Sequence, residues 1–136
     1  MDYFHTGAMV FDFPPSYNIA PTTFQPVIRL NRDTGEREIA MMRWGLIPSW
    51  HQDPKHLGVS AIIITDPNEV AVNVHTRRPA IVEPTDYTRW LTVENEERPP
   101  IDLLRPYDAD AMKAWKVGSA VGNVRNNEAG LLIEAE

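Results

Sequence analysis

His75, Arg77 and Arg78 bring an imidazole and two guanidiniums together over a short stretch of the chain. An imidazole can take up or release a proton near neutral pH, and guanidiniums bind phosphates and carboxylates in a fixed geometry. The cluster therefore suggests proton transfer beside an anionic substrate. The structural alternative is that basic residues at a helix C-terminus compensate the helix dipole.

A strand and a short helix are predicted to position this cluster. Residues 61–64 (AIII) form an apolar run that is typical of a buried strand. Asp66 suits a helix N-cap, and Pro67 suits the first helical position, where a missing N–H costs nothing. The pattern predicts a helix over residues 67–74. His75 would then lie where this strand–helix unit ends.

A β-hairpin is predicted in the first third of the chain. Residues 26–32 (PVIRLNR) and 37–44 (REIAMMRW) have strand patterns, and residues 33–35 (DTG) supply turn chemistry between them. The prolines of residues 14–22 exclude a helix there and indicate an extended segment.

The second half of the chain shows weaker patterns. We expect a short strand at 79–82, an amphipathic helix over 83–91, helical turns at 103–104 and 108–115, and a final strand over 115–124.

Composition limits the class of protein. With 136 residues, the chain is expected to form one domain. Its net charge of −6 argues against a generally basic nucleic-acid binder, although local basic stretches allow a cationic groove. There is no cysteine, so a disulfide, a thiolate nucleophile and a cysteine-based zinc site are excluded. No apolar stretch is long enough to predict a membrane span or a signal peptide, so a cytoplasmic protein with no membrane partner is expected.

Two further residue patterns could form binding sites. Trp44 and Trp50 could stack on unpaired bases, or they could be core residues. His51 and His56 lie either side of Asp53, but no third ligand is indicated, so no metal and no other cofactor is expected.

Several segments together resemble the SRAP family, the SOS-response-associated peptidase or abasic-site-processing proteins. They are Tyr17–Thr22 (YNIAPT), Arg43–Trp50 (RWGLIPSW), His75–Pro79 (HTRRP) and Val121–Asn126 (VGNVRN), and Glu83–Leu91 is also similar.

The resemblance implies an α+β fold: a single domain over residues 1–136, with a β-barrel-like antiparallel core and short flanking helices. The N-terminal motifs (14–50) would join directly to the C-terminal half (60–136), because the family's central portion has no counterpart here. It also implies binding of single-stranded or abasic DNA in the SOS and DNA damage response, with peptidase-, hydrolase- or lyase-type chemistry in a covalent protein–DNA linkage. The implied catalytic residue is His75. The implied DNA-binding residues are Arg77, Arg78, Arg43, Trp44, Trp50, Asn18, Pro21 and Thr65.

The sequence departs from the family at the chemistry itself. The family's N-terminal cysteine is absent, and so are the central segments that carry its catalytic asparagine and glutamate; Arg78 replaces a family methionine. Capturing an aldehyde as a stable ring needs an amine and a thiolate on one residue, whereas an amine alone forms a transient Schiff base. Covalent crosslinking is therefore expected to be lost, and whether the chain is an enzyme stays open.

Two other hypotheses remain from the sequence. The chain could be an inactive remnant or interaction module that forms a homodimer through exposed strand edges. It could also be a hydrolase in which His75 activates Ser60 or Thr65, although no spacing requires that arrangement.

Overall fold

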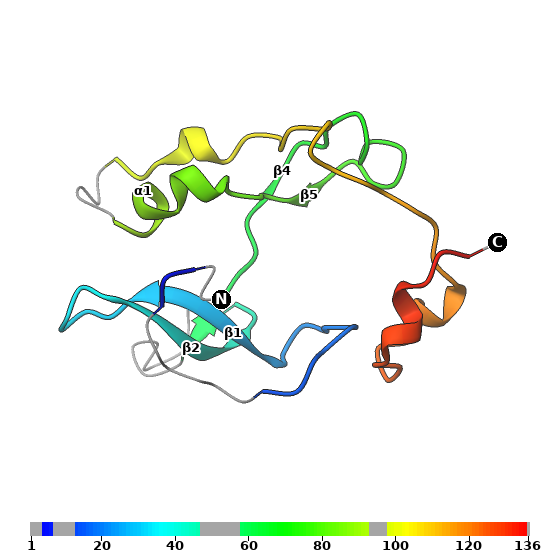
Figure 1. The fold of residues 1–136 in the computed structure, drawn as a ribbon, viewed down its shortest axis with the longest axis horizontal. Coiled ribbons are helices and arrows are strands. Elements are labelled where there is room, and N and C mark those ends of the chain that lie inside the picture. The colour runs from blue at the N-terminus through cyan, green and yellow to red at the C-terminus, as the bar shows by residue number, and fades with distance from the viewer. Residues whose placement is uncertain (1–3, 7–12, 47–57, 93–97, 136) are drawn as a thin grey trace. The chain divides into compact units, whose positions relative to one another are not determined.

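The computed structural model describes residues 4–6, 13–46, 58–92 and 98–135 (Figure 1). The chain divides into two compact units, one comprising Met1–Ala61 with Trp115–Glu136 and the other comprising Ile62–Ala114. The first unit is thus built from both ends of the chain, and the second from its middle.

A β-hairpin dominates the first unit. β1 (Phe24–Leu30) pairs antiparallel with β2 (Arg37–Trp44), and β2 pairs in parallel with the short β3 (Val59–Ser60), which gives the order β1-β2-β3. The predicted hairpin is confirmed, with β1 displaced by two residues from the expected 26–32.

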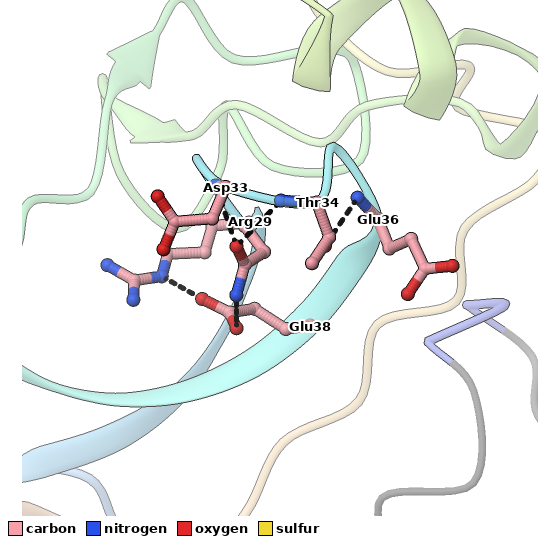
Figure 2. Close-up of polar contacts among 6 residues, drawn as sticks. Arg29, Asp33, Thr34, Glu36 and Glu38 are labelled. Atoms are coloured by element: carbon pink, nitrogen blue, oxygen red, sulfur yellow. Dashed lines mark hydrogen bonds and ion pairs between the residues drawn. The ribbon is translucent and has the colours of Figure 1, made fainter.

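The hairpin turn is built around one asparagine. The Oδ1 of Asn31 accepts hydrogen bonds from the backbone N–H groups of Asp33 (2.9 Å) and Thr34 (3.1 Å). The Thr34 hydroxyl accepts from the N–H of Glu36 at 3.2 Å (Figure 2). Gly35 has a φ of 71°, a left-handed conformation that glycine adopts without strain. The turn is therefore specified locally, as its composition predicts.

Glu38 links the turn to the strands. Its carboxylate accepts from Asn31 Nδ2 at 2.9 Å and from Arg29 Nε at 2.7 Å, and Arg29 lies directly opposite on β1 (Figure 2). The hydrogen bond from Asn31 is the largest cause that lowers the pKa of the Glu38 carboxyl, and the hydrogen bond from Arg29 is the second largest.

The C-terminal part of the first unit is held by short turns. Two 3₁₀ helices, η4 (Ser119–Gly122) and η5 (Ala129–Leu132), lie between the ends of an isolated bridge that joins Val117 to Glu134. Leu131 is buried here, and Trp115 Nε1 donates to the carbonyl of Leu132 at 3.0 Å. The strand predicted over 115–124 is wrong, because i→i+3 hydrogen bonds fold this part of the chain into turns.

The second unit carries a small sheet and one α-helix. β4 (Ile64–Thr65) pairs antiparallel with β5 (Arg78–Pro79). η2 (Pro84–Asp86) leads into α1 (Tyr87–Leu91), which confirms the helix expected over 83–91. η3 (Ile101–Leu103) follows and places Leu103 in the interior.

The helix predicted over 67–74 is wrong. Residues 69–74 form a turn, in which the N–H groups of Val72 and His75 bond to the carbonyls four residues earlier. The capping residue is Asn68, whose Oδ1 accepts from the N–H of Ala71 at 3.1 Å, and not Asp66. One apolar face over so few residues does not repay the cost of helix nucleation.

Three other expected elements differ from the structure. In place of the strand expected at 61–64, β4 begins only at Ile64. In place of the strand expected at 79–82, β5 comprises Arg78–Pro79. Of the expected helical turns, η3 lies at Ile101–Leu103, and residues 108–115 contain no helix.

The α+β class is confirmed. Within the described ranges the strands form one three-stranded and one two-stranded sheet and do not close into a barrel. In the same ranges, no helix combines the length and apolar character needed to cross a bilayer.

Candidate functional site

Two motif segments meet at the end of β2 in the first unit. The N–H of Thr22 donates to the carbonyl of Trp44 at 2.7 Å, and the N–H of Trp44 donates to the carbonyl of Thr23 at 2.9 Å. Arg43 Nε donates to the carbonyl of Thr22 at 3.1 Å. The proline-bearing segment is thereby fixed to the hairpin.

Thr22 is held in a strained conformation. Its φ is 74°, and a β-branched residue in the left-handed region is a genuine outlier. Such a conformation costs roughly 1–2 kcal/mol for a non-glycine residue, and here the hydrogen bonds to Trp44 and Arg43 maintain it. Backbone strain of this kind concentrates at functional sites, which draws attention to the neighbourhood of Thr22.

A third motif segment, from the C-terminus, joins the same region. Asn18 Nδ2 donates to the carbonyls of Val121 (2.9 Å) and Asn123 (3.1 Å). In return, Asn127 Oδ1 accepts from the N–H groups of Tyr17 (2.6 Å) and Asn18 (3.2 Å). The structure thus unites three segments that are far apart in the sequence.

The side chains predicted to bind DNA differ in their exposure to solvent. Arg43 and Pro21 are exposed, and Trp44 is half-buried. Arg43 and Trp44 are consecutive in β2, so their side chains point to opposite faces of the sheet. An exposed guanidinium can pair with a phosphate, and a partly open indole can stack on a base. Trp50, like the His51, Asp53 and His56 group, lies outside the described residues.

His75 and Arg77 lie in the second unit, and both are exposed. The Nδ1 atom of His75 lies 3.0 Å from the N and 3.1 Å from the O of Arg77. A neutral ring accepts there from the N–H, and a protonated ring can donate to the carbonyl. The loop therefore orients the imidazole in both states and leaves Nε2 for a substrate.

Arg78 does not lie as expected. It is only 7% exposed, its Nη2 lies 3.1 Å from Met112 Sδ, and its buried Nη1 has no hydrogen-bond partner among the described residues. Arg77, one residue earlier, is exposed, so the two neighbouring arginines differ in their access to solvent. Arg78 is thus turned away from any phosphate that Arg77 could meet.

Thr65 also has an internal partner. It is half-buried, and its hydroxyl donates to the carbonyl of Leu104 at 2.8 Å. With its proton engaged, the hydroxyl is left only as an acceptor, which a phosphate oxygen cannot use.

Asn127 and Met112 are contact residues that the sequence patterns did not single out. Asparagine side chains that bond to backbone groups more than a hundred residues away leave no local signature, although the Asn-rich stretch after Val121 was a weak sign. A left-handed conformation at Thr22 has no sequence signal at all, because such positions favour glycine.

Comparison with known proteins gives one family. The sequence profile of the SOS response associated peptidase (SRAP) family matches residues 3–61 and 55–124. The chain is 25% identical to the abasic site processing protein YoaM of Bacillus subtilis (strain 168) over 196 residues, which cover 89% of this chain and 86% of YoaM. It is 35% identical to YobE of the same strain over 81 residues (58% of this chain and 37% of YobE). It is 44% identical to the abasic site processing protein HMCES of Xenopus tropicalis over 48 residues, which cover 31% of this chain and 14% of HMCES.

The alignment with YoaM spans 196 positions, which is more than the 136 residues of this chain. YoaM therefore contains residues that have no counterpart here. The two profile matches overlap at 55–61, in the region where the sequence motifs indicated a missing central portion.

Proposed function

We propose that this chain, which belongs to the SOS response associated peptidase (SRAP) family, binds single-stranded DNA at abasic sites. It is proposed to do so without forming the family's covalent crosslink. The observation that carries the proposal is that the Tyr17–Thr22 segment bonds both to the end of β2, through Thr22, and to the C-terminal family-like segment, through Asn18. The relatives named above are called abasic site processing proteins, which supplies the substrate class.

The proposed contacts follow from exposure. Arg43 and Arg77 pair with phosphates, and Trp44 stacks on a base. Trp50 is proposed to stack in the same way, and Pro21 offers an exposed apolar surface. Arg78 and Thr65 are proposed to have structural roles in the second unit. The Arg78 side chain is buried there, and the Thr65 hydroxyl bonds to the carbonyl of Leu104.

His75 is proposed to act as a general acid–base at the abasic site. Its exposed ring is oriented through Nδ1 by the backbone of Arg77, so Nε2 can exchange a proton with an opened sugar. General acid–base catalysis of this kind contributes roughly 10²–10⁴-fold, and only where a nucleophile is positioned.

Loss of the crosslink is proposed from the composition. The 136 residues contain no cysteine, so they supply no thiol to close a stable ring with the sugar aldehyde. An amine of this chain would give only a reversible Schiff base. We place this activity in the cytoplasm, in keeping with a role on DNA during the SOS response.

The test compares binding to matched single-stranded oligonucleotides with and without one abasic site. We expect tighter binding to the abasic strand, weaker binding after His75→Ala or Arg77→Ala, and no denaturant-resistant adduct. Arg32→Ala, an exposed arginine at the hairpin turn, is the control and should bind like the wild type. Equal or absent binding to both strands by all these proteins would refute the proposal.

A second candidate is an interaction module without DNA affinity. Ile62, Ile63 and Ile64 are 50%, 43% and 51% exposed, and in the described part of the chain the β4–β5 sheet has no third strand. Exposed apolar residues beside an open strand edge favour pairing with a second copy. A mass that rises with concentration, in a protein that binds neither oligonucleotide, would support this function over the first.

A further inference from the structure

Two asparagines form a reciprocal pair of contacts in the first unit. Asn127 Oδ1 accepts from the N–H groups of Tyr17 and Asn18 at 2.6 and 3.2 Å, and Ser16 Oγ lies 3.5 Å away. Asn18 Nδ2 donates to Val121 O and Asn123 O at 2.9 and 3.1 Å. We call the contacts of Asn18 and Asn127 the asparagine clasp.

The clasp joins backbone groups of two irregular segments through side-chain amides. Residues 13–20 are in neither helix nor strand, and Asn127 supplies an acceptor to two of their N–H groups. The carbonyls of Val121 and Asn123 lie at the end of η4, and the carbonyl of Asn123 also accepts from the N–H of Asn126 at 2.9 Å. In the clasp, Asn127 contributes its side-chain oxygen as the acceptor, and Asn18 contributes both protons of its side-chain amide.

The clasp fixes one end of the Tyr17–Thr22 segment, and β2 fixes the other. At the far end, Thr22 is bonded to Trp44 and Arg43. The exposed Pro21 lies between these two anchors. Releasing the clasp would therefore free the segment at one end and loosen the strained Thr22 beside Arg43.

We infer that Asn127 is a positioning residue for the DNA-binding surface, and that Asn18 acts with it by holding the Tyr17–Thr22 segment rather than by touching DNA. This inference rests on the proposed function. Asn127 lies outside the residues that the family profile matches, 3–61 and 55–124.

The chemistry of the clasp predicts opposite results for the same substitution at its two positions. Asn127→Asp keeps the acceptor oxygen, whereas Asn18→Asp removes both donated protons and sets a carboxylate against two carbonyls. Both variants add one negative charge, so general repulsion of DNA is matched between them. We expect the affinity of Asn127→Asp for the abasic oligonucleotide to lie within about threefold of the wild-type affinity. Asn18→Asp and Asn127→Ala should bind this oligonucleotide roughly five- to thirtyfold more weakly than the wild type.

A second readout does not depend on DNA. Amide hydrogen exchange of the full-length chain, followed by NMR, should show protected N–H groups at Tyr17 and Asn18 in the wild type and Asn127→Asp. Both N–H groups should lose protection in Asn127→Ala, and protection elsewhere in the β1–β2 hairpin should stay, which separates loss of the clasp from unfolding.

Equal affinities of Asn18→Asp and Asn127→Asp, or unchanged protection in Asn127→Ala, would overturn the inference. If the wild type binds no DNA, the proposed function fails and the positioning role fails with it. The exchange experiment then still decides whether the clasp forms, so the two failures are distinguishable.

Discussion

Replacing Arg78 with methionine should make the protein more stable. Arg78 is 7% exposed, its Nη1 is buried without a partner among the described residues, and its Nη2 meets only the weak sulfur acceptor of Met112. In the described part of the chain no carboxylate pairs with this guanidinium, so no ion pair there offsets its desolvation. Methionine is similarly long and unbranched and adapts to an irregular space, so it can fill the same position without a charge.

The size of the effect follows from the unpaired group. A buried donor left without a partner costs about 1–3 kcal/mol, and more when it is charged. We therefore expect Arg78→Met to raise the free energy of unfolding by about 1–3 kcal/mol. For a chain of this length, each kcal/mol corresponds to roughly 4 °C in Tm.

The matched control is Arg77→Met, the same change one residue earlier at an exposed position. It should alter the free energy of unfolding by less than about 0.5 kcal/mol. DNA binding should respond in the opposite way: Arg77→Met weakens it and lowers the salt dependence by about one phosphate contact, whereas Arg78→Met leaves it unchanged.

Urea denaturation and oligonucleotide titrations on the two variants provide the measurements. A loss of 1 kcal/mol or more in Arg78→Met would show that the guanidinium forms favourable interactions, and the reasoning from its burial would then fail. A fall in DNA affinity for Arg78→Met would equally contradict the inward placement of this side chain.

Two further predictions concern the first unit. Thr22→Gly should raise the free energy of unfolding by up to about 1 kcal/mol in a urea titration, because glycine adopts a φ of 74° without strain, and an unchanged or lower value would show that Thr22 is not strained. The Glu38 pKa is lowered from 4.5, so its carboxylate stabilises the fold above that value and the stabilisation is lost as the pH falls through the lowered pKa. Thermal unfolding from about pH 6 to about pH 3 should therefore show a smaller acid-induced loss for Glu38→Gln than for the wild type, and parallel curves would refute this role of Glu38.

The elements that the sequence predicted correctly are those determined by neighbours in the chain. The β1–β2 hairpin combines alternating strands with turn residues that bond to one another, as Asn31 does with Asp33 and Thr34. The helix at 83–91 begins with a proline at its first position and has one apolar face. In both cases local chemistry and the final structure agree.

The parts that could not be predicted depend on partners distant in the sequence. The turn at 69–74 had helix signals, but its capping asparagine, Asn68, also donates to Tyr107 O at 2.8 Å and is held by that contact. The contacts of Asn127 with residues 16–18 span more than a hundred residues of the chain, and no periodicity reveals them. The cationic cluster is visible in the sequence, but only the fold shows which of its two arginines is buried.

The two-ended construction of the first unit has a consequence for synthesis. The ribosome completes Ile62–Ala114 before it makes Trp115–Glu136, so the middle unit can fold while the hairpin still lacks its C-terminal portion. More than a hundred residues are synthesised after Asn18 before its acceptors, the carbonyls of Val121 and Asn123, are present. A released chain truncated after Ala114 should therefore be protected from proteases in its middle while its beginning stays open to cleavage.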